Sequence, residues 1–274
     1  MAETLADRLE TGVVSADALQ VYRGLPILTN QPERPTRLVA IRDLDEEMSV
    51  GEYAVLAHEA IDELVEEHGI AVVAGGTGLY LRAALVELAV PPAPKPGARE
   101  RWESVYDSDP HTAHAQLAEL DPQAAAAVHP NDRRRVVRAL ELADEGASLV
   151  PESDRLWSHE VRRPTLIVGL ELAKERLEER IHERTASMLG RGVAEEVQRA
   201  LADGLSRTAA QALGLRELAE LESDEAGEAI VSRTRRYAAY QQKWMRRIPG
   251  IVMIDADRPP EELADAILEV AGVG

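Results

Sequence analysis

The chain has 274 residues and no cysteine. The absence of cysteine excludes disulfides and thiolate chemistry, and it removes the commonest ligand of structural zinc. The first residues, Met-Ala-Glu-Thr, lack the basic and apolar segments of a secretory signal. No run approaches ~18 uncharged apolar residues, the length of a membrane-spanning helix, because Arg82 and Glu87 interrupt the most apolar zone. We therefore expect a cytoplasmic protein with no membrane partner.

Positive charge is scarce. The chain has 31 Lys and Arg against 49 Asp and Glu, a formal net charge of −18, which argues against attraction of nucleic acid over the whole surface. The basic residues nevertheless gather at 133–138, 233–236 and 243–247. Each string alone is more typical of a solvated helix face, but together they leave room for a local basic groove.

Hydrophobic periodicity and turn residues indicate an α/β protein with one insertion. The patterns predict strands at 12–15, 38–41, 70–74, 164–170 and 251–255, and helices at 3–10, 49–67, 79–88, 174–203, 226–247 and 260–271. Two β–α units in succession favour a parallel, doubly wound sheet. The proline-rich stretch 90–97 and the charged, strandless segment 99–146 indicate a helical insertion. The predicted domains are a core of 1–90 and 151–274 and an insertion of 91–150.

Asp17 stands just beyond the strand predicted at 12–15. Open parallel sheets place their ligands at this end of a strand. A carboxylate there can bind magnesium or act as a general base. Taken on spacing alone, a residue that caps the next turn explains Asp17 at least as well.

Gly75-Gly76-Thr77-Gly78 follows the strand predicted at 70–74 and opens a helix. Glycines allow close approach of the backbone, and the first amides of a helix can hold an anion. The stretch fits neither G-x-x-x-x-G-K-[ST] nor G-x-G-x-x-G. A tight turn in which Thr77 caps the helix is an equally good explanation.

Two helices could bind RNA. Asn131 or Asp132 can cap the start of the first helix, in which Arg134 and Arg138 share a face suited to phosphate oxygens. His129, just before this helix, has no partner at the spacing of metal ligands. In the second, Tyr237, Tyr240 and Trp244 form one stripe beside arginines. Aromatic rings flanked by arginine can stack on bases, although a core-packing stripe is the commoner cause of such spacing.

Four stretches in this order resemble the tRNA dimethylallyltransferase family: SADALQVYRG, VVAGGTGLYLRA, HPNDRRRVVRALE and TRRYAAYQQKWMRR. The resemblance covers nearly the whole chain. Members transfer a dimethylallyl group from dimethylallyl diphosphate to N6 of adenine 37 in tRNAs that read codons beginning with U, which gives i6A. The resemblance implies a P-loop-kinase-like fold, a parallel sheet with helices on both faces, and a helical insertion that grips the anticodon stem-loop. It also implies ATP-type nucleotide binding, Mg²⁺ as cofactor, a monomer, and flipping of the adenine out of its stack.

The resemblance also assigns roles to residues. Asp17 is the general base that takes a proton from the N6 amine, and Arg184 (in the pattern Arg-Ile-x-x-Arg-x-x-x-Met) steadies the leaving pyrophosphate. The residues implied to contact tRNA are Asp17, Ala18, Leu19, Gln20, Thr77, Arg99, Arg134, Arg135, Val136, Val137, Arg138, Gln211, Arg216, Gln241, Trp244 and Arg246.

The chain departs from the family pattern at several polar positions. Ala18 stands where the family usually has Ser, Gln31 where it has Lys, and Ala239-Tyr240 where it has Lys-Arg. These changes remove one hydroxyl and three positive charges. We therefore expect binding to the RNA backbone to be weaker, or more sensitive to salt for each remaining contact.

The family's phosphate loop is the largest difference. Members begin with a strand and G-P-T-x-x-G-K-[ST] directly before the helix that ends here at Leu9, and that loop holds the diphosphate and Mg²⁺. Residues 1–274 do not contain the motif, so no metal ligand is identified. The expected explanation is an enzyme whose true start lies upstream of Met1. The alternatives are a truncated RNA-binding paralogue without transferase activity and a transferase for free adenine nucleotides, which the insertion and the basic helix disfavour.

Overall fold

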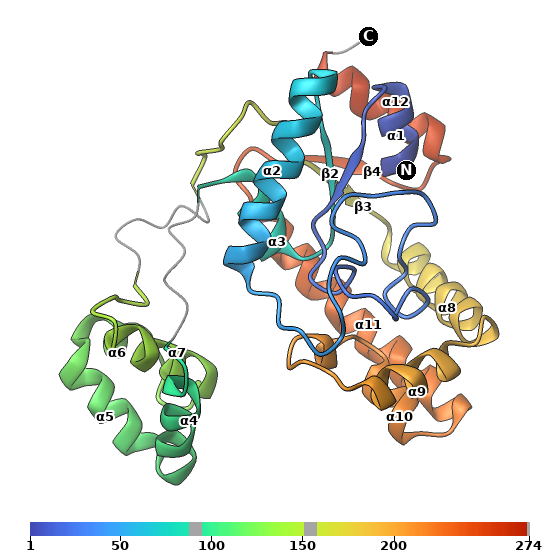
Figure 1. Cartoon of the computed structure of the whole chain (residues 1–274). Coiled ribbons are helices and arrows are strands. Elements are labelled where there is room, and N and C mark those ends of the chain that lie inside the picture. Colours follow the sequence, from blue (N-terminus) through green and yellow to red (C-terminus); the bar gives the residue numbers. More distant parts are fainter. Residues whose placement is uncertain (88–94, 151–157, 273–274) are drawn as a thin grey trace. The chain divides into compact units, whose positions relative to one another are not determined.

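The computed structural model describes residues 1–87, 95–150 and 158–272 (Figure 1). The chain divides into two compact units: unit 1 comprises Met1–Glu87 and Leu156–Gly274, and unit 2 comprises Leu88–Arg155. The sequence places the division a few residues away, at 90/91 and 150/151. Most of the proline-rich stretch 90–97 lies outside the described residues.

The strands of unit 1 form two parallel pairs. β1 (Val13–Ser15) pairs with β2 (Val72–Ala74), and β3 (Val168–Glu171) pairs with β4 (Val252–Asp255). In each pair the first residues of the two strands lie opposite one another. Parallel strands need a crossover connection of about a dozen or more residues, and long helical connections join the strands of each pair here. The predicted parallel α/β architecture is confirmed.

Helices make up most of unit 1. They are α1 (Ala2–Arg8), α2 (Val50–His68), α3 (Gly78–Leu85), α8 (Lys174–Gly190), α9 (Val193–Asp203), the 3₁₀ turn η2 (Ala209–Gln211), α10 (Leu215–Glu220), α11 (Ser223–Met245) and α12 (Pro260–Ala271). The ends of α2 follow from the sequence, since Ser49 accepts the amide of Glu52 and Gly69 takes the left-handed conformation that ends the helix.

One hydrophobic cluster joins both strand pairs. It contains Leu5, Ala6, Val13, Val72, Ile254, Ala256, Leu263, Ala264 and Ile267, with Val168 and Val252 packed against it. These residues come from α1, α12 and all four strands, so α1 and α12 cover one face of the strands. On the other side, α2 approaches β1, where the Tyr53 hydroxyl donates to the Ser15 carbonyl (3.0 Å) (Figure 1). Helices thus lie on both faces, as predicted.

Two predicted elements are wrong. Residues 38–41 form no strand, because Leu38 (φ 64°) and Ala40 (φ 53°) have left-handed backbones that a strand does not accept. Only single bridges remain beside them, Val14 with Arg37 and Tyr22 with Arg42. The helix predicted over 174–203 is two helices, because Gly192 (φ 85°) breaks the chain between α8 and α9.

Unit 2 contains four helices within its described residues: α4 (Ala98–Ser108), α5 (Pro110–Leu120), α6 (Pro122–Ala127) and α7 (Arg133–Ala143). The starts of α5, α6 and α7 are set by Asp109, Asp121 and Asp132, each of which accepts a backbone amide of the first turn. Apolar side chains such as Trp102, Leu117 and Leu140 form the core between them. The helical nature of this segment is as predicted.

Among the helices that the structure describes, none combines the length and apolar character needed to cross a membrane.

Candidate functional site

Asp17 lies at the carboxyl end of β1, in a turn that holds its carboxylate. Its Oδ1 accepts the backbone amides of Leu19 (2.9 Å) and Gln20 (3.4 Å). Within the described residues, no hydrogen bond involves Oδ2. The side chain is therefore oriented through one oxygen, which is what a positioned base requires. Asp17 can therefore cap its turn through Oδ1, as the sequence allowed, and still have Oδ2 for a catalytic role.

The Gly75–Gly78 turn packs directly on the Asp17 turn. The amide of Ala16 donates to the Ala74 carbonyl (2.7 Å), and the amide of Ala18 donates to Thr77 Oγ1 (3.3 Å). A Cβ at Gly75 would overlap the backbone of Ala16, so glycine is required by this close approach. Thr77 precedes α3, but its side chain does not cap the helix and instead binds the neighbouring turn. The carboxyl ends of β1 and β2 thus form one polar edge.

α11 closes over the Gly75–Gly78 turn. Gln241 Nε2 donates to the Gly76 carbonyl (2.8 Å), and the Trp244 ring occupies the space where a Cβ on Gly78 would lie. The Tyr237 hydroxyl is desolvated, which raises its pKa, while polar contacts with Thr77 and Gln241 lower it and the charge of Asp17 raises it. The aromatic stripe is therefore split: Tyr237 and Trp244 face this turn, although Tyr237 is still 39% exposed, and Tyr240 is 60% exposed.

Arg184 on α8 lies within electrostatic range of Asp17. Desolvation lowers the pKa of Arg184, and the Asp17 carboxylate raises it. The residue is exposed at the surface, so the desolvation is partial. A guanidinium in such a place can take up the negative charge of a leaving group.

Side chains hold the segment after Asp17 through contacts that the sequence did not indicate. Gln20 Nε2 donates to the Asn30 carbonyl (2.9 Å), and Gln31 Nε2 donates to the Tyr22 carbonyl (2.7 Å). Glu196, which is buried on α9, accepts the amides of Ile27 and Leu28. Gln31, the position at which the family usually has Lys, therefore has a structural role here.

Unit 2 places most of the predicted arginines on its surface. Arg134 and Arg135 are exposed, and Arg138 is half-buried. Arg99, from α4, meets Arg138, from α7, at the carboxylate of Glu141. Val136 and Val137 are buried in the core of the unit, because the helical period turns these two positions away from the basic face. Their predicted contact with tRNA stays a prediction.

The remaining predicted contacts lie at the surface of unit 1. Gln211 ends η2 and is exposed, and Arg216 forms an exposed ion pair with Glu220 (3.0 Å). Both line a hollow between α10 and α11 of about 570 Å³. Arg246 is exposed just after α11. Neither Gln211 nor Arg216 is joined to Asp17 by a hydrogen bond or ion pair among the described residues.

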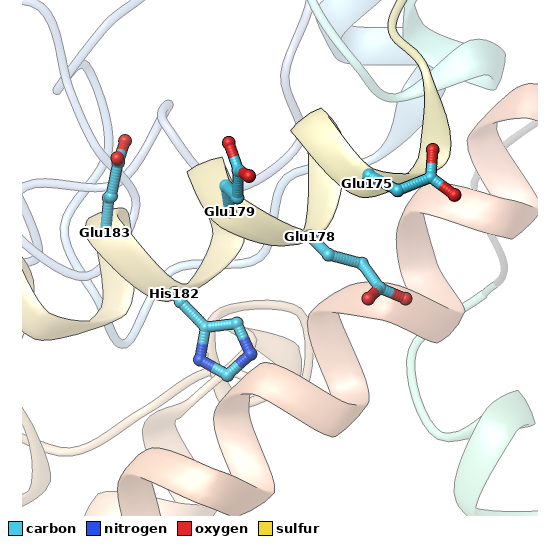
Figure 2. Close-up of a pocket in the computed structure, with 5 residues that line it drawn as sticks. All are labelled: Glu175, Glu178, Glu179, His182 and Glu183. Atoms are coloured by element: carbon cyan, nitrogen blue, oxygen red, sulfur yellow. The ribbon is translucent and has the colours of Figure 1, made fainter.

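A second hollow lies on α8 and is acidic. Glu175, Glu178, Glu179 and Glu183 line it together with His182 (Figure 2). Four carboxylates repel a diphosphate and an RNA backbone, so this hollow does not extend the site around Asp17. Among the described residues, no group of three or more His, Cys, Asp or Glu side chains could hold a metal ion. Asp17 therefore belongs to no such group of side chains.

Two side chains near the Asp17 turn were not assigned to that turn from the sequence. Tyr237 belongs to the aromatic stripe, and its spacing of four from Gln241 places both on one helix face, so a signal for a shared role was present. Glu196 had none, because the residues that it binds are about 170 positions away along the chain.

The chain matches the family model described as IPP transferase over residues 20–248. It is 37% identical to a tRNA dimethylallyltransferase of Kineococcus radiotolerans, over 95% of this chain and 86% of that protein. It is 38% identical to a tRNA dimethylallyltransferase of Streptomyces coelicolor, over 90% of this chain and 83% of that protein.

Solved structures agree with the sequence comparison. The tRNA isopentenylpyrophosphate transferase of Bacillus halodurans is similar with a TM-score of 0.69 and 29% identity, over 99% of this chain and 91% of that one. A eukaryotic dimethylallyltransferase acting on tRNA shares the fold with a TM-score of 0.78 at 24% identity, over 100% of this chain and 76% of that one.

Proposed function

This chain belongs to the IPP transferase family, and from that premise we propose that it is a tRNA dimethylallyltransferase. The reaction transfers a dimethylallyl group from dimethylallyl diphosphate to N6 of adenine 37 in tRNAs that read codons beginning with U, and the product is i6A. The observation that carries this proposal is the oriented carboxylate of Asp17 at the shared edge of β1 and β2, with the positive charge of Arg184 within electrostatic range.

The chemistry needs a base, because a neutral exocyclic amine is a poor nucleophile. The N6 nitrogen forms a bond to C1 of the dimethylallyl group while the bond from C1 to the diphosphate oxygen breaks. The Asp17 carboxylate takes one N6 proton, and the bonding pair leaves with the diphosphate. Arg184 steadies that leaving group. Mg²⁺ and a phosphate-binding loop would supply further charge neutralisation at the diphosphate.

Substrate RNA binds in this proposal through both units. Thr77 and the face of α11 flank Asp17, where the flipped adenine enters, and the arginines of unit 2 hold the anticodon stem-loop. Two observations support this arrangement: Arg134 and Arg135 are exposed, and α11 contacts the Gly75–Gly78 turn. We further propose that the protein acts as a cytoplasmic monomer and binds nucleotide in the manner of ATP-binding P-loop proteins.

The decisive experiment is i6A formation in unmodified tRNA incubated with dimethylallyl diphosphate and Mg²⁺. It compares residues 1–274 with a chain that also contains the residues encoded by the in-frame upstream codons. Asp17→Asn should reduce turnover by about 10²–10⁴-fold, the usual contribution of general base catalysis. Asp45→Asn, which makes the same change at an exposed position, is the matched control and should keep turnover unchanged.

The two alternatives give different results in the same assay. A truncated paralogue without transferase activity would bind an anticodon stem-loop but yield no i6A in either form of the chain. A transferase for free nucleotides would modify AMP and leave tRNA unmodified. Normal turnover by the Asp17→Asn variant would remove Asp17 from the base role.

A further inference from the structure

The hydroxyl of Tyr53 is a buried polar group beside the strand that leads to Asp17. Tyr53, on α2, is 0% exposed, and its ring packs on that of Tyr80 with 4.2 Å between the ring centroids. Its hydroxyl donates to the backbone carbonyl of Ser15 (3.0 Å), the last residue of β1. Burial raises the pKa of the Tyr53 hydroxyl, and electrostatic interactions with Tyr80 and Asp17 raise it further. The hydroxyl therefore stays protonated, as a donor must.

This hydroxyl takes the place of a backbone donor at the end of β1. On the side of β1 away from β2, the Ser15 amide donates to the Arg37 carbonyl (3.0 Å). In a continued parallel ladder, the next amide to bind Ser15 would be that of Val39, two residues beyond Arg37. The left-handed backbone of Leu38 turns the chain away, and the Val39 amide donates three residues back instead (3.4 Å). The Tyr53 hydroxyl binds the Ser15 carbonyl at this point.

Ser15 is also the residue from which the Asp17 turn starts. Its buried hydroxyl donates to Gln20 Oε1 (2.9 Å), at the other end of the turn. The amides of Leu19 and Gln20 donate to Asp17 Oδ1. The carbonyl of Ser15 is thus held by Tyr53 and its hydroxyl by Gln20, and these two bonds fix the frame in which the Asp17 carboxylate is oriented.

We propose that Tyr53 is a positioning residue for the reaction, whose hydroxyl holds the end of β1 so that the Asp17 carboxylate is aligned with the N6 amine. The proposal rests on the proposed function, in which Asp17 is the base. A phenylalanine would fill the same space beside Tyr80, so packing alone does not require the hydroxyl. Without this donor the Ser15 peptide can rotate, and a small displacement of a catalytic group costs rate. Tyr53 itself touches no substrate, because it is buried.

Tyr53→Phe removes the donor and keeps the ring. At saturating tRNA and dimethylallyl diphosphate, the single-turnover rate of i6A formation should fall by about tenfold, the effect of one lost hydrogen bond. The Kd for tRNA should stay unchanged, because the loss acts on the base and on no RNA contact. Hydrogen exchange of the Leu19 and Gln20 amides should become faster, because the turn is less restrained. The experiment uses the chain that includes the residues encoded upstream.

Tyr106→Phe is the matched control. The Tyr106 hydroxyl is also buried and also donates to a backbone carbonyl, that of Pro130 (2.8 Å), but it lies in unit 2. Both variants lose the same atom and the same kind of bond, so both should melt at a somewhat lower temperature. Only Tyr53→Phe should be slow and should show faster exchange in the Asp17 turn.

A second pair of variants separates positioning from a general loss of order. A residue that acts through Asp17 has no further effect once the base is removed. Tyr53→Phe combined with Asp17→Asn should therefore be as slow as Asp17→Asn alone. In the presence of Asp17, para-aminophenylalanine in place of Tyr53 keeps an N–H donor and should restore most of the rate.

Several outcomes would overturn the proposal. They are an unchanged rate for Tyr53→Phe, an equal loss of rate for Tyr106→Phe, and a further loss of rate in the double variant. Failure of Tyr53→Phe to fold, checked by circular dichroism, would show a role in stability and would also overturn it. If the otherwise unchanged protein forms no i6A, the proposed function fails instead. Hydrogen exchange still decides in that case whether Tyr53 restrains the Asp17 turn, and unchanged exchange in Tyr53→Phe would show that it does not.

Discussion

Replacing Gly75 by alanine tests whether the turn after β2 and the turn that carries Asp17 act as one unit. A Cβ at this position would overlap the carbonyl oxygen, carbonyl carbon and Cα of Ala16. All three are backbone atoms, so no side chain can rotate away. The amide of Ala16 also donates to the Ala74 carbonyl at 2.7 Å, which ties the two segments together beside the overlap.

The cost can be worked from these contacts. Overpacking of a tight site costs about 1–3 kcal/mol. Loss of the hydrogen bond between Ala16 and Ala74 adds about 0.5–1.5 kcal/mol. The free energy of unfolding should therefore fall by about 1.5–4.5 kcal/mol in total. A shift of the order of 1 Å in the Asp17 turn should also reduce turnover by about 10²-fold.

The assay pairs urea denaturation with i6A formation on unmodified tRNA. Gly190→Ala is the matched control, because no atom lies within 4 Å of its added Cβ and the residue lies in α8. It should be neutral or more stable by up to about 1 kcal/mol, the helix propensity difference between the two residues. If Gly75→Ala matches the unchanged protein in both stability and turnover, the two turns are not coupled as described.

Further predictions concern the loop after Asp17 and the change of the free energy of unfolding at low pH. Glu196→Ala should lower the free energy of unfolding by about 2–5 kcal/mol, since the part-buried amide of Ile27 and the buried amide of Leu28 lose their acceptor. A urea curve coincident with that of the unchanged protein would contradict this. The bond from Arg162 lowers the pKa of Asp62, so this pair stabilises the protein above the ordinary carboxyl pKa and is lost as pH falls through the lowered value. Asp62→Asn should thus cost up to about 1 kcal/mol near pH 7 and progressively less as pH falls below the ordinary carboxyl pKa of about 3.9. A loss in urea titrations that stays the same as pH falls would refute that assignment.

Local chemistry made the helices and buried strands predictable. The cap at Ser49, the stop at Gly69 and the β-branched run before Gly75 are short-range signals, and the structure follows them. The prediction failed at residues 38–41, where an apolar run that looks like a strand adopts left-handed turns at Leu38 and Ala40. Pairing with neighbouring segments, which no local pattern contains, decided that conformation.

The candidate site shows the same division. The sequence by itself placed Asp17 at a strand end, Thr77 in a glycine turn and a basic face on the helix at 133–143, because each depends on residues a few positions apart. Only the tertiary structure brought Gln241 and Trp244 into contact with that glycine turn and Glu196 into contact with the loop after Asp17. It also brought Arg99 and Arg138 to the same carboxylate, that of Glu141. These contacts join residues about 40 to 170 positions apart, and their partners are chosen by packing of the folded chain.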